Sequence, residues 1–386
     1  MKILIENAYR MLDRSLLPAM TQWVTEQALA IQQIPAPTFC EQKRAAYVAE
    51  QMQTLGLHDV ETDDKYNVYG RLAGENSDLP AVMIIAHTDT VFPMETDLTT
   101  RREKNVIYGP GLGDNSIGVA GMLGVIEWLR LQNIRLPCDI WFVATSGEEG
   151  LGDLGGIRAA FARLKSKVKC VINLEGLAFG HLYYAGIAVR RLHITAHAEG
   201  GHSWLHFGNQ SAIHGLIELG SRILAITPPA SPRTTYNIGM IDGGQSVNSI
   251  AAQASMWLDM RSQTQMQLNT LEQQVRATMQ TSTRPGLRFE TRVVGDRPAG
   301  AIPVEHALIQ GAMHALKMVS VRGILEVGST DGNIPLAAGC PTVTLGVTRG
   351  GNAHRLDEFV ELEPIGDGMT QIMTLVIAAA QKSFNS

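Results

Sequence analysis

The sequence predicts an α/β protein in which a smaller α+β domain is inserted into a larger domain built on a mainly parallel sheet. The chain has 386 residues, more than one typical domain. Continuous apolar runs, typical of strands buried on both faces, occur with helical apolar spacing in its first half and again near its end. Between these regions apolar and polar residues alternate. We therefore predict a larger domain of residues 1–186 and 297–386, and an inserted domain of residues 187–296.

The larger domain begins with two predicted helices, because apolar residues recur at helical spacing between residues 16 and 56 and the IPAPT segment interrupts them. Apolar runs that predict strands follow at residues 67–72, 81–86, 138–144 and 169–174, with a helical stretch at residues 117–131. After the inserted domain, the pattern predicts a helix, the strand RGILEV, a second helix, the strand PTVTLGV and a final helix from Pro364. We expect helices on both faces of the sheet.

The inserted domain shows the order strand, helix, strand, strand, helix, strand. Its strands are predicted at RRLHITAH, TTYNIGMI, AAQASMWLDMR and LRFETRVVG, and its helices at residues 212–226 and 265–280. This order is that of a ferredoxin-like α+β unit. The alternation within the strands indicates that helices cover one sheet face and leave the other more open.

Composition and charge argue against several classes of partner. The formal net charge is −5 and the chain has no basic run, so nucleic acid is not expected to bind. The N-terminal segment carries Glu6, Arg10 and Asp13 where a secretory signal needs an apolar stretch, and no segment reaches the ~18 apolar residues of a membrane span. The four cysteines are far apart without CxxC spacing, which indicates buried free thiols. We expect a cytoplasmic protein without a membrane partner.

Ionisable residues cluster where the predicted strands of the larger domain end. His87 and Asp89 follow the run AVMIIA, the pair Glu148-Glu149 follows CDIWFVATSG, and Glu175 follows KCVINL. In open α/β sheets, ligands bind at the carboxyl ends of the strands. The three clusters are therefore expected to share one site.

Two further residues extend this set. Asp114 lies in GPGLGDNSIG before a predicted helix, and His354 lies in GGNAHRLDE after the strand PTVTLGV. Two imidazoles and several carboxylates on one rim repel each other unless cations neutralise them. Mixed histidine and carboxylate ligands suit Zn²⁺, with Mn²⁺ or Co²⁺ as substitutes, and the number of ligands fits two ions.

Each of these residues also has an ordinary structural interpretation. Asp114 could cap the helix that follows, the Glu148-Glu149 pair could be a solvated surface, and His354 could be an exposed loop residue. Their joint placement favours the metal site. A rival motif, GxGxxG at Gly150 to Gly155 with Glu175 after the next strand, is typical of dinucleotide binding. Carboxylates stand where a pyrophosphate needs positive potential, so we disfavour it.

The motifs HTDTVFP, GPGLGDNSIG, TSGEEGLG, NLEG, GGHSW, GGQSVNSI and LDMRS, together with His354, occur in this order. In this respect the chain resembles the di-zinc aminoacylase and exopeptidase family, which includes peptidase T, carboxypeptidase G, acetylornithine deacetylase and succinyl-diaminopimelate desuccinylase. The resemblance implies a zinc-exopeptidase-like catalytic domain with an inserted ferredoxin-like lid and dimerisation domain. Asn115, in GDN, departs from the GDD or GDK of many relatives without removing a ligand.

The resemblance also implies roles for the clustered residues. Asp114 would bridge two metal ions, with His87 and Glu175 at one ion and Glu149 and His354 at the other. Asp89 would orient the His87 ring. Glu148 would act as the general base that takes a proton from a metal-bridging water. The bond between Asp114 and Asn115 would be a cis peptide.

Within the lid, the resemblance implies three functional residues and an assembly. His202 in GGHSW would reach the active site of a partner subunit, with His206 as a competing candidate. Asn248 and Arg261 would hold the carbonyl and the carboxylate of the substrate. We therefore expect a homodimer formed through the lid.

The implied activity is metal-dependent hydrolysis of an amide bond. IPAPT and HTDTVFP favour a tripeptidase-like or carboxypeptidase-like enzyme that acts on small peptides over a deacylase of N-acyl amino acids, which stays the alternative. Alternatives of another class are a non-catalytic ligand-binding relative and a dinucleotide-binding oxidoreductase. The intact ligand set and Glu148 argue against the first of these.

Overall fold

The computed structural model describes residues 1–384. The chain forms two compact units, one made of Met1–Gly186 together with the segment from Gly300 onward, the other of Ile187–Ala299. Among the described residues, no helix is both long and apolar enough to span a membrane.

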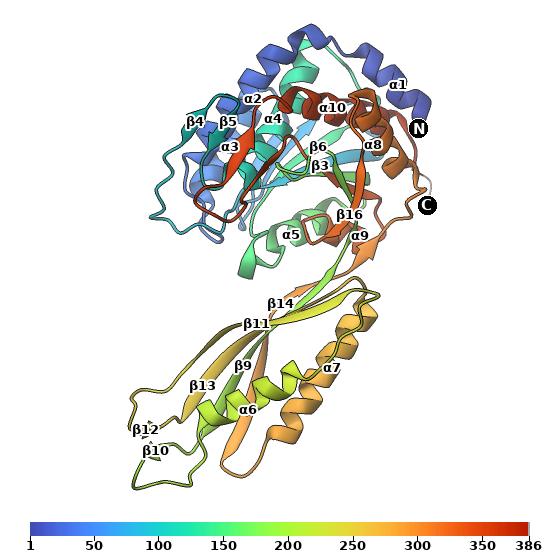
Figure 1. Ribbon diagram of the computed structural model, residues 1–386. Coiled ribbons are helices and arrows are strands. Elements are labelled where there is room, and N and C mark those ends of the chain that lie inside the picture. The colour runs from blue at the N-terminus through green and yellow to red at the C-terminus, as the bar shows by residue number, and fades with distance from the viewer. Residues whose placement is uncertain (385–386) are drawn as a thin grey trace. The chain divides into compact units, whose positions relative to one another are not determined.

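The first unit is built on a nine-stranded sheet, with strand order β1-β2-β6-β3-β7-β17-β8-β15 and β16 paired to β8 (Figure 1). The strands are β1 His58–Thr62, β2 Val68–Leu72, β3 Ala81–His87, β6 Ile140–Thr145, β7 Val168–Leu174, β8 His181–Gly186, β15 Gly300–Ala301, β16 Ile324–Gly328 and β17 Thr342–Leu345. The central neighbours β6, β3, β7 and β17 run parallel. The predicted α/β class with a mainly parallel central sheet is confirmed.

The two faces of this sheet bury separate apolar cores. Val82 and Ile84 of β3 belong to one core, and Met83 and Ile85 belong to the other. Every residue of β3 is buried, because both faces are covered, and this explains its continuous apolar run. The helices of the unit are α1 Lys2–Met11, α2 Leu17–Gln32, α3 Gln42–Thr54, α4 Ile117–Leu131, α5 Gly155–Leu164, α8 Ala307–Met318, α9 Asn333–Ala337 and α10 Ile365–Gln381. In Figure 1, α5 and α9 lie on the face opposite to α2, α4 and α10.

A second sheet of the first unit has four strands in the order β18-β19-β5-β4. Its strands are β4 Arg101–Glu103, β5 Val106–Tyr108, β18 Gly350–Gly351 and β19 Phe359–Glu361. All its pairs are antiparallel. It joins a segment from the first third of the chain to a segment close to the C-terminus.

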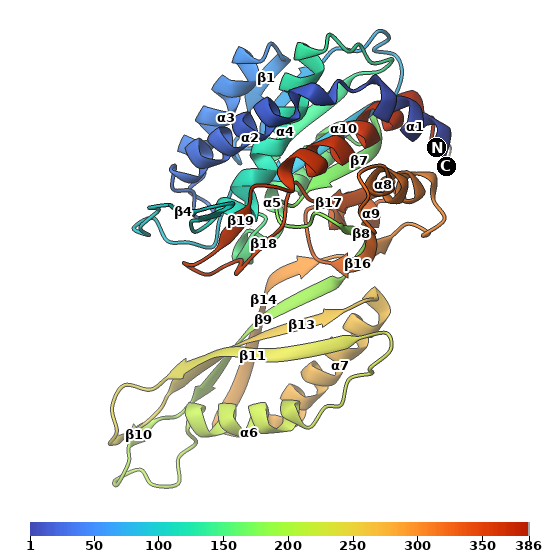
Figure 2. The same cartoon turned by 45° about the horizontal axis from the view of Figure 1, so that its top comes forward.

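The second unit forms the sheet β11-β13-β9-β14, in which all pairs are antiparallel (Figure 2). Its elements are β9 Ala188–Ala198, β10 Gly201–His202, α6 Ala212–Leu224, β11 Thr234–Gly243, β12 Ser249–Ile250, β13 Gln253–Ser262, α7 Gln265–Ser282 and β14 Leu287–Arg297. This is the predicted ferredoxin-like order, with the short pair β10 and β12 added. The chain leaves the first unit at Gly186 and returns at Gly300, and these two residues are paired between β8 and β15.

The structure also shows elements that the periodicity did not predict. Helix α1 and helix α5 were missed, as were β1, β8 and the strands of the small sheet. Helix α5 begins at Gly155, within the glycine-rich segment GEEGLGDLGG, whose composition indicates a turn. The expectation of buried thiols holds for Cys138 and Cys170 but is wrong for Cys40, which is exposed in the loop before α3. Its backbone N–H donates to the Pro37 carbonyl oxygen at 2.8 Å.

The buried strand β6 offers a test of this core. Phe142→Ala should lower the free energy of unfolding by about 3–5 kcal/mol, because the ring is fully buried and its removal leaves a cavity. Ile3→Ala in α1 is the control, since that side chain is 71% exposed. Urea denaturation followed by circular dichroism measures both, and equal shifts for the two variants would contradict the core assignment.

Candidate metal centre

Three neighbouring parallel strands bring most of the expected residues to one edge of the sheet. His87 is the last residue of β3, Glu148 and Glu149 lie in the loop after β6, and Glu175 directly follows β7. Strand β3 lies between the other two and pairs with both, with His87 opposite Thr145. The carboxyl ends of the strands therefore meet, as the sequence predicts.

Asp114 lies in a tight turn, η2 Leu112–Ser116, directly before α4, and its side chain belongs to the same cluster. The Asp114–Asn115 peptide bond is cis, as the resemblance implied. Asn115 fastens this turn to the end of β7, because its Nδ2 donates to the Leu174 carbonyl at 2.8 Å and its Oδ1 accepts the Gly176 N–H at 2.8 Å. Asn115, the third residue of GDN, thus connects two segments that carry nominated ligands.

His354 comes from the loop between β18 and β19, so the small sheet positions it. Its backbone adopts a φ of 68° in the left-handed region, and its side chain is half exposed. Its Nε2 lies 3.0 Å from Asp114 Oδ2 and 3.0 Å from Glu149 Oε1. A residue near the end of the chain thereby joins residues from its first half.

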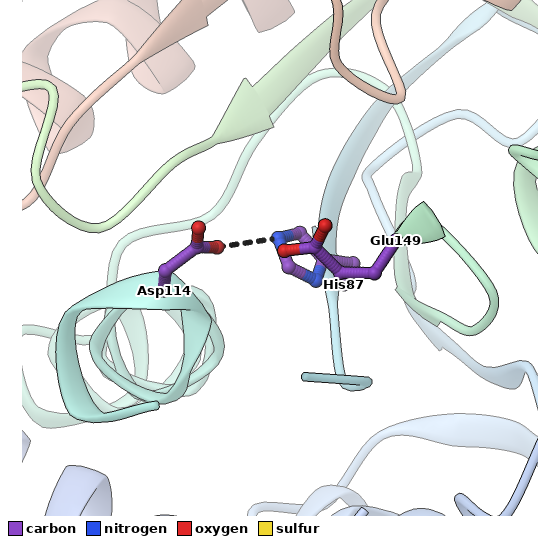
Figure 3. Close-up of side chains that lie close together, drawn as sticks. All are labelled: His87, Asp114 and Glu149. Atoms are coloured by element: carbon purple, nitrogen blue, oxygen red, sulfur yellow. Dashed lines mark ion pairs between the residues drawn. The ribbon is translucent and has the colours of Figure 1, made fainter. Parts of the chain in front are cut away.

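The carboxylate of Asp114 lies between the two imidazole rings. Its Oδ1 is 3.0 Å from His87 Nε2, and its Oδ2 is the oxygen that faces His354. Each ring also has a glutamate beside it. Glu175 Oε2 lies 3.5 Å from His87 Nε2, and Glu149 Oε1 lies beside His354 Nε2. Figure 3 shows Asp114, His87 and Glu149 directed toward one another. The structure thus brings together all five residues that the sequence nominated as ligands.

The donor atoms have the spacing that a metal ion requires. His87, Asp114 and Glu149 each offer one ligand atom, and these atoms lie within 4.8 Å of one another. Nitrogen and oxygen atoms around a tetrahedral ion at ~2.0–2.2 Å are separated from one another by about 3.4 Å. The contacts of 3.0 to 3.5 Å at His87 and His354 fall close to this value.

The electrostatics of the cluster show an excess of negative charge. Burial opposes a charge on His87, but the carboxylates of Asp114, Asp89 and Glu175 outweigh it and raise the pKa of the ring well above its ordinary value. Hydrogen bonds to Asp114 and Glu149 raise the pKa of His354 to about 10. Burial alone would raise the pKa of Asp114, but both imidazoles hold it below its usual range. The site therefore favours bound positive charge.

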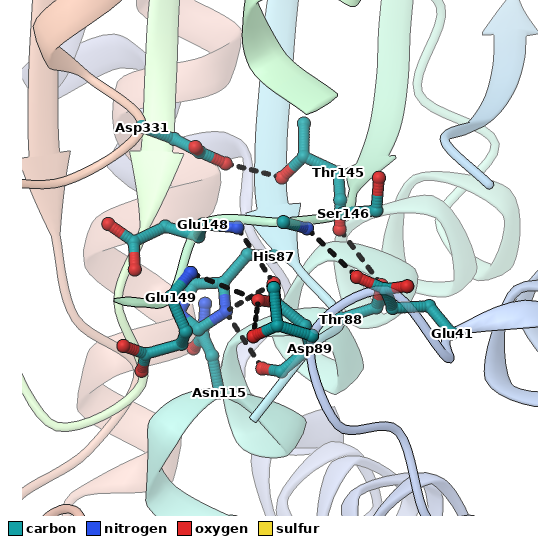
Figure 4. A network of polar contacts seen from close by, with 12 residues as sticks. Glu41, His87, Thr88, Asp89, Asn115, Thr145, Ser146, Glu148, Glu149 and Asp331 are labelled. Carbon is teal, nitrogen blue, oxygen red and sulfur yellow. Dashed lines mark hydrogen bonds and ion pairs between the residues drawn. The ribbon is translucent and has the colours of Figure 1, made fainter. Parts of the chain in front are cut away.

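Asp89 supports the loop that carries the two glutamates. It is fully buried, its Oδ1 accepts the Glu148 N–H at 2.9 Å, and its Oδ2 accepts the Glu149 N–H at 3.0 Å (Figure 4). Thr38 Oγ1 also donates to Oδ2 at 2.8 Å. The Nδ1 of His87 lies 3.1 Å from the Asp89 backbone carbonyl and 3.6 Å from its carboxylate. Asp89 thus contacts the glutamate loop more closely than it contacts the ring.

Three buried acids near the centre were not singled out from the sequence. Glu41 accepts the Gly147 N–H at 3.0 Å, and Glu358 accepts the N–H groups of Gly113 and Asp114 at 2.5 and 2.9 Å. Asp331 accepts a hydrogen bond from Thr145 Oγ1. Burial raises the pKa of Glu358 and of Asp331 to about 7. The sequence signal that could have pointed to Glu358 is its position four residues after the nominated His354.

Glu148 is buried in the same loop, with its backbone held by Asp89. Figure 4 shows its side chain and that of Glu149 leaving the loop on the same side, away from Glu41. The two adjacent carboxylates therefore face the same region of the first unit.

In the second unit, His202 and Asn248 lie at the same end, since His202 pairs with Ser249 in the β10–β12 ladder. The His202 N–H donates to His206 Nδ1 at 2.9 Å, and Asn248 Oδ1 accepts from Ser246 Oγ at 2.7 Å. Arg261 lies near the far end of β13, which begins at Gln253, so the two ends are about 27 Å apart. The structure does not bring Arg261 to the other two residues within one copy of the second unit.

Comparison with known proteins gives a consistent set of matches. A sequence profile of peptidase family M20/M25/M40 matches residues 83–378. The succinyl-diaminopimelate desuccinylase of Corynebacterium glutamicum is 27% identical over 343 residues, which cover 86% of this chain and 90% of that protein. A probable carboxypeptidase of Aspergillus oryzae is 31% identical over 220 residues, 50% of this chain and 48% of that one. A tripeptidase of Staphylococcus aureus superposes with a TM-score of 0.80 at 22% identity, over 94% of this chain and 99% of that chain, and so shares the fold.

The raised pKa of His354 predicts how metal uptake depends on pH. Below pH 10 this ring carries a proton that an incoming ion must displace, whereas an ordinary histidine has lost it above about 6.5. The apparent affinity for Mn²⁺ should therefore keep rising between pH 7 and 9, by about tenfold per pH unit for each proton displaced. Titration of metal-free protein against a competing chelator measures it, and His354→Ala should reduce the slope. An affinity that levels off at pH 7 would contradict the prediction.

Proposed function

Because the chain belongs to peptidase family M20/M25/M40 and is therefore a hydrolase, we propose that it cleaves an amide bond of small peptides, in the manner of a tripeptidase or a carboxypeptidase. The family resemblance inferred from the motifs is confirmed by the profile match. The observation that carries the proposal is the Asp114 carboxylate, which gives one oxygen to each of two imidazole rings. The second candidate is a deacylase of N-acyl amino acids, which the desuccinylase relative favours.

Two divalent ions, Zn²⁺ or else Co²⁺ or Mn²⁺, fit this donor set. His87 and Glu175 would hold one ion, Glu149 and His354 would hold the other, and Asp114 would contribute to both. The support for this division is that each Asp114 oxygen faces a different histidine, each with its own glutamate. When bound, the ions would polarise the substrate carbonyl and lower the pKa of the attacking water.

Glu148 is the general base of the proposed reaction. Its carboxylate takes a proton from the water as the water oxygen bonds to the amide carbon, and passes that proton to the nitrogen when the C–N bond breaks. Asp89 fixes the backbone of Glu148 and of Glu149 through separate oxygens. One residue therefore positions both the proposed base and a proposed ligand, and this makes Asp89 a positioning residue.

We propose that one substrate molecule contacts lid residues from two copies of the chain. Arg261 would bind the substrate carboxylate and Asn248 its carbonyl, with His202 stabilising the negative charge on the oxygen. A peptide of three residues spans about 10 Å, much less than the length of β13. One small substrate therefore meets Arg261 of one copy and His202 and Asn248 of another.

We accordingly propose a homodimer formed through the lid. Strand β11 is an edge strand of the lid sheet, and Ile217 and Leu224 of α6 are exposed apolar residues that a partner would cover. A second copy and a small peptide, and neither nucleic acid nor a membrane, are the proposed partners. The free thiols fit a reducing, cytoplasmic location.

The two adjacent glutamates allow a test of the proposed mechanism. Metal-loaded protein should hydrolyse members of a panel of Gly-Gly-Gly, dipeptides and N-acetyl amino acids, and chelation should abolish this activity. Glu148→Gln should keep its metal content and lose about 10²–10⁴-fold in kcat, because a general base is removed. Glu149→Gln is the matched variant and should lose metal instead. Full activity after exhaustive metal removal, or loss of metal in both variants, would contradict the assignment.

Shared sites predict complementation between two inactive chains. A Glu148→Gln chain and a His202→Ala chain should each be nearly inactive alone. Co-refolded, they should form heterodimers in which one site combines an intact Glu148 with an intact His202, so activity should return. If sedimentation and tagged pull-down prove heterodimers but activity stays absent, His202 does not act on a partner's site.

A further inference from the structure

Exposed apolar side chains are concentrated on the loops around the metal centre. The structure describes ten exposed large apolar side chains in the first unit, and five of them lie within five residues of the cluster or of the acids that hold its loops. These five, which we call the apolar rim, are Phe39, Val91, Met94, Leu151 and Leu356. Exposed apolar residues are ordinary where they are scattered singly, but their concentration beside a polar site marks a binding surface.

Phe39 differs from the rest of the apolar rim because its backbone is strained as well. The Cys40 N–H donates to the Pro37 carbonyl oxygen at 2.8 Å and closes a four-residue β-turn, in which Phe39 is the third residue with a φ of 76°. A positive φ at this position is that of a type II turn, which normally has glycine or asparagine there, because a bulky side chain is strained. The Phe39 side chain is also 64% exposed, so burial does not compensate for the strain.

Tyr66 shows what a structural reason for the same strain looks like. It is another aromatic residue of the first unit with a positive φ, 69°. Its side chain packs against the larger apolar core, and its hydroxyl accepts a hydrogen bond from Gln42 Nε2 at 2.6 Å. Within residues 1–384, Phe39 belongs to none of the apolar cores and its ring pairs with no other ring. Strain that brings no structural gain is typical of residues that serve function.

The turn that carries Phe39 is attached to the metal centre through Thr38. The Thr38 Oγ1 donates to Asp89 Oδ2 at 2.8 Å, and the same oxygen accepts the Glu149 N–H at 3.0 Å (Figure 4). One residue and two hydrogen bonds therefore separate Phe39 from the Glu149 backbone. This path is comparable with the ~10 Å that a peptide of three residues spans.

We propose that Phe39 is a specificity-determining residue, whose ring contacts a large apolar side chain of the substrate next to the amide bond that is cleaved. An aromatic ring gives a large apolar contact area, and the closed turn holds its backbone in place before the substrate binds. The other residues of the apolar rim add apolar surface on neighbouring loops. The inference rests on the proposed function and adds a substrate class to it: small peptides, or N-acyl amino acids, with a large apolar residue at the cleaved bond.

Thermal unfolding tests whether the Phe39 ring has a structural role instead. Phe39→Gly should not lower the unfolding midpoint, because glycine adopts a positive φ without strain and the ring makes no core contact. Tyr66→Gly is the matched control and should lower the midpoint by about 4 °C or more, since it loses core contacts. Equal losses of stability in the two variants would overturn the proposal.

Kinetics with metal-loaded protein test the substrate preference. The better of Leu-Gly-Gly and Gly-Leu-Gly should exceed Gly-Gly-Gly at least about tenfold in kcat/KM, and N-acetyl-L-leucine should exceed N-acetylglycine in the same way if the protein is a deacylase. Phe39→Gly should reduce the ratio to about threefold or less, whereas Phe39→Tyr should keep it. Leu79→Ala, which removes an exposed apolar side chain before β3, is the control and should leave the ratio unchanged.

The outcomes separate this inference from the proposed function. If the protein hydrolyses the panel but cleaves leucine and glycine substrates equally, or if Phe39→Gly keeps the preference, Phe39 does not set specificity and only the proposed function stands. If Phe39→Gly shifts the protein from dimer to monomer in sedimentation without changing the ratio, the ring contacts a second copy and the inference is wrong.

If the metal-loaded protein hydrolyses no member of the panel, the proposed function fails and the ring is tested by binding. Isothermal titration of that protein should then show about tenfold tighter binding of the better leucine peptide than of Gly-Gly-Gly. The difference should be lost in Phe39→Gly. Equal affinities in the unsubstituted protein, or no binding of any peptide at millimolar concentration, would overturn the inference as well.

Discussion

The contact of one carboxylate with two imidazole rings is the constraint around which the first unit is arranged. Asp114 can reach His87 and His354 together only if a strand end, a turn before a helix and a loop near the C-terminus converge. Glu149 and Glu175 add negative charge within a few ångströms, where the interior screens charges far less than water does. The backbone must therefore hold these charged side chains close together. The parallel order of β6, β3 and β7 does so, because it brings the carboxyl ends of the three strands side by side.

Around that cluster, buried acids serve as acceptors for backbone N–H groups. Asp89 holds the loop of Glu148 and Glu149, Glu358 holds the turn that carries Asp114, and Glu41 holds Gly147. Charge-assisted hydrogen bonds of this kind are stronger than neutral ones and fix direction as well as distance. The loop of Glu148 and Glu149 and the turn of Asp114 are therefore each held by a buried acid that is not itself a nominated ligand.

Sequence reasoning succeeded where a residue's place follows from a strand. The runs AVMIIA and KCVINL predicted β3 and β7, and the strand ends placed His87 and Glu175 together. It nominated His354 as well, but it did not predict the small sheet that positions this residue. His354 owes its place to strands of two or three residues, which are too short to show any period. The hydrogen bonds of Glu358 and Asp331 are tertiary contacts that leave no local pattern in the sequence. Helix α5 was not predicted because it begins in a glycine-rich segment.

The pairing of Gly186 with Gly300 has a consequence for how such a protein can change over evolutionary time. The chain departs from and re-enters the first unit at two residues that face each other across adjacent strands, about 5 Å apart. A segment inserted at such a junction can lengthen, shorten or be exchanged for another without shifting the register of any strand beneath it. Selection can therefore modify the second unit as a separate module, while the cluster on the first unit stays under its own, stricter constraint.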